Sequence, residues 1–236
     1  MDQNKKVWEI YPRLTRIIRD AHQEHKMDGT GHDFDHALRA AQVCLMIAPT
    51  PLTARIAAAA GLCHNADRML QHARGVGKKD VPDAEVMTMV RSWLAGGESF
   101  ASTDEDFIVD AVLKHSGFNN SEDHPVLVTL MDADRIICSM AEEVMHATRF
   151  WLELPDLDPV HLSHDPEAHS YRNPRSVFKN FECRRDWIDP SSRVCVRLPR
   201  AMELMKRFVG AMNDYIEEVE GQRIELGLYP DYPKFS

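Results

Sequence analysis

Three short segments, 31–36, 64–68 and 132–135, carry imidazole groups, carboxylate groups or both, within a sequence whose pattern is otherwise helical. Imidazole nitrogen and carboxylate oxygen are the ligands with which proteins hold divalent metal ions such as zinc, manganese or magnesium. Helices fix the direction of such side chains better than loops do. The segments therefore predict a metal site, and metal-assisted hydrolysis is a chemistry that such a site performs.

The spacing within these segments places pairs of side chains on one helix face. His64 and Asp67 are three residues apart, as are His36 and Arg39, and at this spacing Cβ atoms are about 5–6 Å apart. The apolar run 56–63 leads directly into His64, and a polar side chain in that setting costs stability unless it is satisfied. A metal would satisfy it, and Arg39 would add a fixed positive charge beside it.

The hydrophobic periodicity along the chain is helical, and no segment has convincing strand alternation. Prolines and glycines mark most of the segment ends. The pattern predicts an all-α fold, a helical bundle with an additional C-terminal helical segment. We expect helices at about 7–18, 37–48, 51–70, 83–94, 103–117 (with Thr103 as its cap), 125–154 and 198–220.

A single domain is expected over the whole chain. Its parts are a core at about 15–150, an irregular loop at 155–173 and C-terminal helices at 174–227. The loop is rich in proline, and long loops in compact domains are often functional, so this one could form a lid. Its histidines are better explained as loop surface than as a second metal site. They are His161, His164 and His169.

The composition fits a globular protein and limits its partners. Hydrophobic residues make up 44% of the 236 residues, and the net charge is −9, from 28 Lys and Arg against 37 Asp and Glu. Because the phosphate backbone binds a basic face, we expect no nucleic acid as a partner. A small phosphorylated molecule needs only a few local cations and stays compatible, and a homo-oligomer is left open.

The chain has the features of a cytoplasmic protein. The N-terminal MDQNKKVWEI lacks the apolar core of a signal peptide, and the apolar stretch 56–63 is too short to span a bilayer. The five cysteines form no CxxC pair, and three of them lie in apolar helical contexts. We therefore expect buried thiols, a reducing cytoplasm and no membrane partner.

Several motifs, taken together and in this order, resemble the HD phosphohydrolase superfamily. They are GHDFDHALRA, AGLCHNADR, LKHSGF and MDADRI, and they cover roughly residues 15–150. The family pattern is a His, then a His-Asp pair about thirty residues on, then a distant Asp that usually follows Ala. His36 matches the first His, His64 and Asn65 match the pair, and Asp134 matches the last Asp. The resemblance implies an HD-type helical domain with a divalent metal site at these positions.

Asn65 departs from this pattern, because the family has Asp there. An amide can coordinate a metal only through a neutral oxygen, and it cannot bridge two cations as a carboxylate does. We therefore expect one divalent ion (Mn, Mg, Co, Ni, Fe or Zn) held by His36, His64 and Asp134, with Asn65 as a weak ligand or a residue that positions water. Asp67 could partly compensate, as a further ligand or as a general base.

The resemblance implies a metal-dependent phosphohydrolase that acts on a small phosphorylated substrate, with a nucleotide as the expected case. Water of lowered pKa would attack phosphorus. Asp67 would accept its proton, and Arg39 and His115 would stabilise the charge on the phosphoryl oxygens. The alternative, motivated by Asn65, is an HD-like domain with weak or no metal binding that acts as a ligand- or protein-binding module.

A third reading is oxidative chemistry at a di-iron site, which distant HD relatives perform. Such a site needs more imidazoles, which His115 with His72 or His124 could supply. It also needs a bridging carboxylate, and Asn65 does not provide one. This reading therefore ranks below the other two.

Several candidates also have a plainer structural explanation. Asp132 competes with Asp134 for the last ligand place, and the Ala-Asp-Arg alignment favours Asp134. Asp33 and His32 could be ligands, but capping the helix that carries His36 explains Asp33 at least as well. Helix ends, surface turns and local ion pairs explain the remaining candidates. These are His115 as a polar helix end, Lys78 and Lys79 as a solvated turn, and Arg39, Arg68 and Arg135 as partners of Asp33, Asp67 or Asp132.

Overall fold

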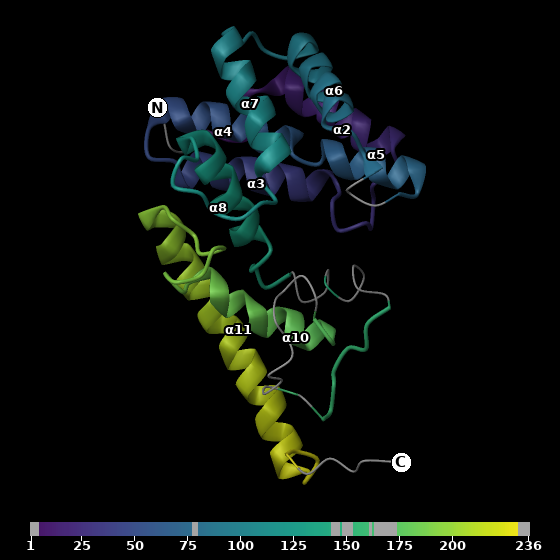
Figure 1. The fold of residues 1–236 in the computed structure, drawn as a ribbon, viewed down its shortest axis with the longest axis vertical. Helices are drawn as coiled ribbons and strands as arrows, with labels where there is room; N and C mark the ends of the chain where they lie inside the picture. Colours follow the sequence, from purple (N-terminus) through teal and green to yellow (C-terminus); the bar gives the residue numbers. More distant parts are fainter. Residues whose placement is uncertain are drawn as a thin grey trace. The chain divides into compact units, whose positions relative to one another are not determined.

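The computed structural model describes residues 5–76, 80–142, 147, 153–160, 162 and 174–230. Within these ranges all regular structure is helical, which confirms the all-α fold (Figure 1). No described helix combines the length and the apolar character needed to cross a membrane. The chain forms two compact units, Met1–Ile137 with Val196–Met202, and Cys138–Cys195 with Glu203–Ser236. The single domain expected from the sequence stays a prediction.

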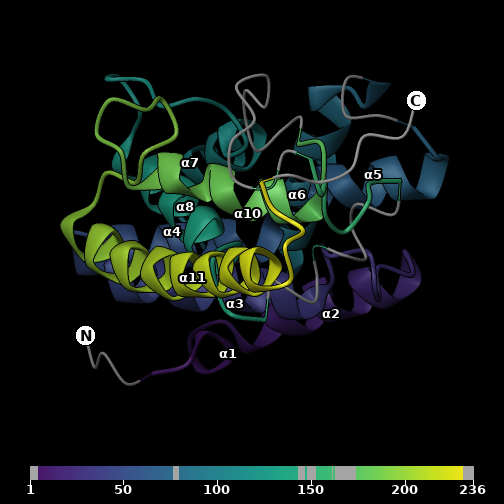
Figure 2. The same cartoon turned by 90° about the horizontal axis from the view of Figure 1, so that it is seen from below.

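The first unit is a bundle in which α3, α4 and α8 pack on one another (Figure 1, Figure 2). α7 lies against α4 and α8, while α6 contacts α2, α5 and α7. The helices of this unit are α1 (Val7–Ile10), α2 (Pro12–Glu24), α3 (Phe34–Ile47), α4 (Pro51–Cys63), α5 (Ala66–Arg74), α6 (Asp83–Gly96), α7 (Ser102–Lys114) and α8 (Pro125–Ile137).

Local capping sets where the site-bearing helices begin and end. The Asp33 carboxylate accepts a hydrogen bond from the His36 N–H, so α3 starts three residues before the predicted position. Thr50 caps α4 in the same way through the Thr53 N–H. The left-handed residue Gly75 (φ 63°) ends α5. The first of these caps is the structural role that the sequence offered for Asp33.

The crossing of α3 and α4 is unusually close, because small residues face each other there. A Cβ atom at Gly61 would lie 2.8 Å from both Cα and N of Ala41. Half of the α4 residues before Gly61 are alanine, and the run from Ala57 to Ala60 is fully buried. Gly61 precedes His64 by three residues, and Ala41 follows His36 by five. The close crossing therefore lies within five residues of each histidine along the chain, and it sets how near α3 and α4 approach each other.

The predicted helix at 51–70 is wrong in its middle, because the chain turns at His64 and Asn65. α4 ends at Cys63 and α5 begins at Ala66. In a continuous α-helix the Gly61 carbonyl would accept from the N–H of residue 65. Here this carbonyl lies 2.7 Å from Nδ1 of His64. His64 and Asp67 consequently do not share one helix, as their spacing had predicted.

Other predicted boundaries also shift. The helix expected at 7–18 is two helices, since Tyr11 precedes Pro12 and takes a non-helical conformation. α7 follows Ala101 with no side-chain cap, so the predicted Thr103 cap is wrong, and α7 ends at Lys114. α8 ends at Ile137 and not near 154. No Gly or Pro marks that end. Apolar periodicity indicates which residues are buried, and it is a less direct sign of their backbone conformation.

The second unit has its own apolar cluster. It contains α10 (Val177–Glu182), the 3₁₀ helix η2 (Cys183–Trp187) and α11 (Pro199–Glu225) from Glu203 onward. These elements lie within the predicted C-terminal helical segment. The buried members of the cluster are Ala147, Leu162, Val177, Phe178, Phe181, Met212 and Ile216.

Candidate metal centre

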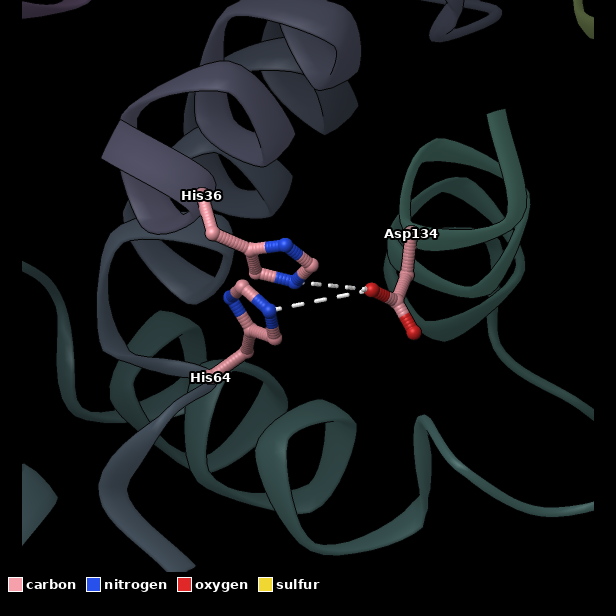
Figure 3. A group of neighbouring side chains, drawn as sticks. All are labelled: His36, His64 and Asp134. Atoms are coloured by element: carbon pink, nitrogen blue, oxygen red, sulfur yellow. Dashed lines mark ion pairs between the residues drawn. The ribbon is translucent and has the colours of Figure 1, made fainter. Parts of the chain in front are cut away.

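Three predicted ligands from three separate segments of the chain come together in the first unit. His36 lies in the first turn of α3, His64 directly follows α4, and Asp134 is in α8 (Figure 3). One potential ligand atom from each lies within 4.8 Å of the other two. Nε2 of His36 is 3.3 Å and Nε2 of His64 is 3.8 Å from Oδ1 of Asp134. Both histidines are buried, and the Asp134 side chain is 25% exposed.

The backbone holds His64 in the tautomer that a metal ligand needs. Its Nδ1 lies 2.7 Å from the Gly61 carbonyl, and because a carbonyl only accepts, Nδ1 carries the proton. The lone pair is therefore on Nε2, the atom that faces Asp134 and has no hydrogen-bond partner. Burial lowers the pKa of His64 to about 3, so the ring stays neutral at ordinary pH. Imidazole ligands commonly donate their other nitrogen to a carbonyl in this way.

Asp134 supplies the negative charge of the group. Burial opposes its ionisation, but the hydrogen bond from His36 and the neighbouring imidazoles outweigh that effect and hold the pKa of Asp134 well below its usual range. The carboxylate is thus ionised. Two imidazole nitrogens and one carboxylate oxygen form a set that suits a borderline divalent ion.

His115 lies beside this group. It directly follows α7, it is buried, and its ring meets the His64 ring edge-on at 5.3 Å between centroids. Its Nδ1 lies 2.7 Å from the Val112 carbonyl, so the Nε2 atom carries the lone pair, as in His64. The His32 ring lies 5.3 Å from the His36 ring, between centroids, and burial lowers the pKa of His32 well below its usual value.

Asp132, the competing carboxylate, has a different position. It is fully buried, and its Oδ2 accepts hydrogen bonds of 2.8 Å from the N–H groups of Arg197 and Leu198, just before α11. Arg135 lies 3.7 Å from its other oxygen. The structure therefore brings Asp134, and not Asp132, next to the histidines, while Asp132 holds the start of α11.

The candidate arginines have local partners. Arg39 lies 2.9 Å from Asp35, one turn earlier on α3, in a pairing that the sequence analysis did not consider. Arg68 donates to Gln71. Arg135 donates to Asn119 and faces Asp132, the latter being one of the ion pairs expected from the sequence. Each arginine is thus at least partly engaged in its own helix or loop.

Asp67 and the remaining histidines lie apart from the group of three. Asp67 is in the first turn of α5, where its carboxylate accepts a 3.4 Å hydrogen bond from Gln71. His124 stacks on Phe107 with 3.8 Å between ring centroids, and His72 is exposed near the end of α5. Among the described residues, none of these belongs to the group that could hold a metal. Lys78, Lys79, His161, His164 and His169 lie outside the described residues.

The structure adds one buried histidine that the sequence analysis missed. His22 lies on the buried face of α2, and its Nε2 is 3.2 Å from Nδ2 of Asn65. The signal was available, because His22 continues the apolar spacing of Leu14 and Ile18 at every fourth residue. The Oδ1 atom of Asn65, like Nε2 of His64, is buried without a hydrogen-bond partner. Two such atoms on adjacent residues are consistent with a bound cation.

Comparison of the chain with protein-family models, with curated proteins and with solved structures finds no match.

Proposed function

We propose that the chain is a metal-dependent phosphohydrolase for a small phosphorylated substrate, with a nucleotide as the expected case, and that His36, His64 and Asp134 hold one divalent ion. The convergence of two imidazole nitrogens and one carboxylate oxygen within 4.8 Å carries this proposal. The unpartnered Nε2 of His64 supports it, because a buried ring nitrogen without a hydrogen bond costs stability unless it is satisfied. The likeness of the motifs to the HD superfamily supports phosphoryl chemistry.

The charges of the group suit an anionic substrate. A divalent ion bound by His36, His64 and Asp134 would supply Lewis-acid chemistry, which polarises a phosphoryl oxygen and activates water. Asp134 would offset only part of its charge, since the buried His64 is neutral. The remaining positive charge would attract a phosphate group. We assign Arg39, one turn beyond His36 on α3, to the phosphoryl oxygens.

His115 and Asp67 are the two candidates for the general base. In the tautomer set by the Val112 carbonyl, Nε2 of His115 can accept a proton from water, and only then can it donate to a phosphoryl oxygen. Its edge-on contact with His64 favours His115 over Asp67, whose carboxylate accepts from Gln71. His115→Asn and Asp67→Asn distinguish them. The variant with the larger fall in kcat, at an unchanged metal Kd, identifies the general base.

The test begins with chelated protein. Calorimetric titration with Mn²⁺, Mg²⁺, Co²⁺ and Ni²⁺ measures the stoichiometry, and a panel of nucleoside mono-, di- and triphosphates is assayed with each ion. We expect one ion per chain, and hydrolysis that His64→Ala and Asp134→Ala abolish. His25→Ala, at the end of α2, is the control with unchanged activity. Hydrolysis that survives both chelation and His64→Ala would refute this mechanism.

A ligand- or protein-binding module without tight metal is the second candidate, and Asn65 favours it. The group of three contains a single carboxylate, and the adjacent Asn65 contributes no charge. Fewer charged ligands mean a weaker hold on a divalent ion. Purified protein with no stoichiometric metal, no calorimetric binding and no hydrolysis would select this candidate over the phosphohydrolase.

A further inference from the structure

The Asn65 side chain uses its amide nitrogen in three contacts. Nδ2 lies 3.0 Å from the His32 carbonyl, 3.4 Å from the Asp33 carbonyl and 3.2 Å from Nε2 of His22. Asn65 is fully buried, and its Oδ1 has no hydrogen-bond partner. The two carbonyls can only accept, so the nitrogen, and not the oxygen, must face them. This position therefore requires a hydrogen-bond donor.

His22 is held so that it, too, can only accept from Asn65. Its Nδ1 lies 2.7 Å from the Ile18 carbonyl one turn earlier in α2, so Nδ1 carries the proton of the neutral ring. Nε2 then presents a lone pair to Asn65. The ring is buried, and it packs edge-on against Phe34 at 5.9 Å between centroids. Backbone and packing thus fix both the tautomer and the orientation of His22.

These contacts join the two helix ends that carry the histidines of the candidate metal centre. Asn65 directly follows His64 at the turn between α4 and α5. The carbonyls that it binds belong to the two residues before α3, and the second of them, Asp33, also caps the His36 N–H. A displaced Asn65 would allow His36 and His64 to move relative to each other. The positions of metal ligands depend on the hydrogen bonds that support them.

We infer that His22 and Asn65 are a pair of positioning residues, and that His22, together with the two main-chain carbonyls, makes an amide, and not a carboxylate, the required group at position 65. An ionised Asp at this position would direct an oxygen at three lone pairs. These are the two main-chain carbonyls and Nε2 of His22. The amide of Asn65 therefore matches its three acceptors. Asn65→Asp lowers the metal affinity of the site although it adds a negative charge. The metal-affinity part of this inference rests on the proposed function.

A double-mutant cycle tests the pair. Asn65→Asp is expected to lower the thermal midpoint of the chelated protein and to raise the Mn²⁺ Kd by about 10–100-fold, the usual loss when support for a ligand is removed. Gln at position 22 can accept from an amide or, after rotation, donate to a carboxylate. His22→Gln alone should therefore have the smaller effect, and the double variant should bind Mn²⁺ more tightly than Asn65→Asp.

Asn180→Asp is the matched control, because this buried Asn uses its Oδ1, which accepts from Arg184, and a carboxylate can keep that bond. It should leave the Mn²⁺ Kd unchanged. All Kd values are measured at a temperature where every variant is folded, so that lost stability alone does not change them. Tighter Mn²⁺ binding by Asn65→Asp, or no recovery in the double variant, would overturn the inference.

A measurement on the metal-free protein separates this inference from the proposed function. ¹⁵N-resolved NMR of the histidine rings reports which nitrogen of His22 carries the proton. We expect a protonated Nδ1 and a bare Nε2 in the wild type. A proton on Nε2 would contradict the pair even if the protein binds metal. Absence of metal binding would reject the proposed function, while the NMR result and the thermal midpoints would still decide on His22 and Asn65.

Discussion

The replacement of Gly61 by Ala tests how the helix crossing supports the candidate metal centre. The added Cβ would lie 2.8 Å from Cα and N of Ala41 and 3.2 Å from the carbonyl carbon of Ala40. All three are backbone atoms, so no side-chain rotation can relieve the contact. Since ordinary contact begins at 3.4 Å, α3 and α4 must separate by 3.4 − 2.8 = 0.6 Å.

Two opposing effects set the magnitude. Overpacking of a close-packed interior costs about 1–3 kcal/mol, and the cost lies toward the upper end here because main chain must move. Alanine in place of glycine within a helix stabilises the folded state by about 1 kcal/mol. We therefore expect a net loss of about 1–2 kcal/mol in the free energy of unfolding. The crossing lies five residues from His36 and three from His64 along the chain, so a shift of this size also moves their ring nitrogens relative to each other.

Urea unfolding followed by far-ultraviolet circular dichroism measures the stability, and calorimetry measures the Mn²⁺ affinity, which we expect to fall about tenfold. Gly210→Ala in α11 is the matched control. No atom lies within 4 Å of a Cβ built there, so this change should stabilise by up to about 1 kcal/mol. If Gly61→Ala is as stable as the wild type and binds Mn²⁺ equally well, the crossing does not set the geometry of the site.

Three further predictions concern the two aspartates of α8, the hydrogen bond of Tyr11 and the reactivity of two cysteines. Asp132→Ala strands two main-chain N–H groups before α11 and should cost about 1–3 kcal/mol in urea unfolding, whereas Asp134→Ala should abolish Mn²⁺ binding in calorimetry with a smaller loss of stability. Tyr11→Phe removes a hydrogen bond to a main-chain carbonyl and should cost about 1 kcal/mol by the same unfolding assay. Burial raises the pKa of Cys183 to about 11, so its reaction with Ellman's reagent should accelerate as pH rises toward that value, while the fully buried Cys63 should react only on unfolding.

The helical nature of the chain and most of its helix positions are readable from the sequence. Apolar spacing locates the helices, because each must bury one face, and local chemistry sets several of their ends, as Asp33 does for α3. The ends of α4 and α8 were not predicted. No local sequence signal marks them. At the end of α4, the Asn65 side chain binds the His32 carbonyl, which is more than 30 residues away, and such a contact leaves no local pattern in the sequence.

Sequence alone determined which residue types were available for chemistry and their order along the chain. It indicated His36, His64 and the pair Asp132 and Asp134 as candidates, because imidazole and carboxylate groups in apolar helices need a partner, and the resemblance to the HD superfamily favoured Asp134. The tertiary structure then separated Asp134 from Asp132. These two residues are almost adjacent in sequence but project from different sides of α8, one toward the histidines and one toward the start of α11.

The role of Asn65 also needed the fold. The resemblance to the HD superfamily, which has Asp at this place, led to the expectation that Asn65 is a weak metal ligand or a residue that positions water. Its partners, His22 and the carbonyls of His32 and Asp33, are more than 30 residues away in sequence. A hydrogen bond depends on distance and direction in space, and no sequence pattern encodes these for groups so far apart. The packing of α2 and α3 around the α4–α5 turn decides that the amide nitrogen is the atom this position uses.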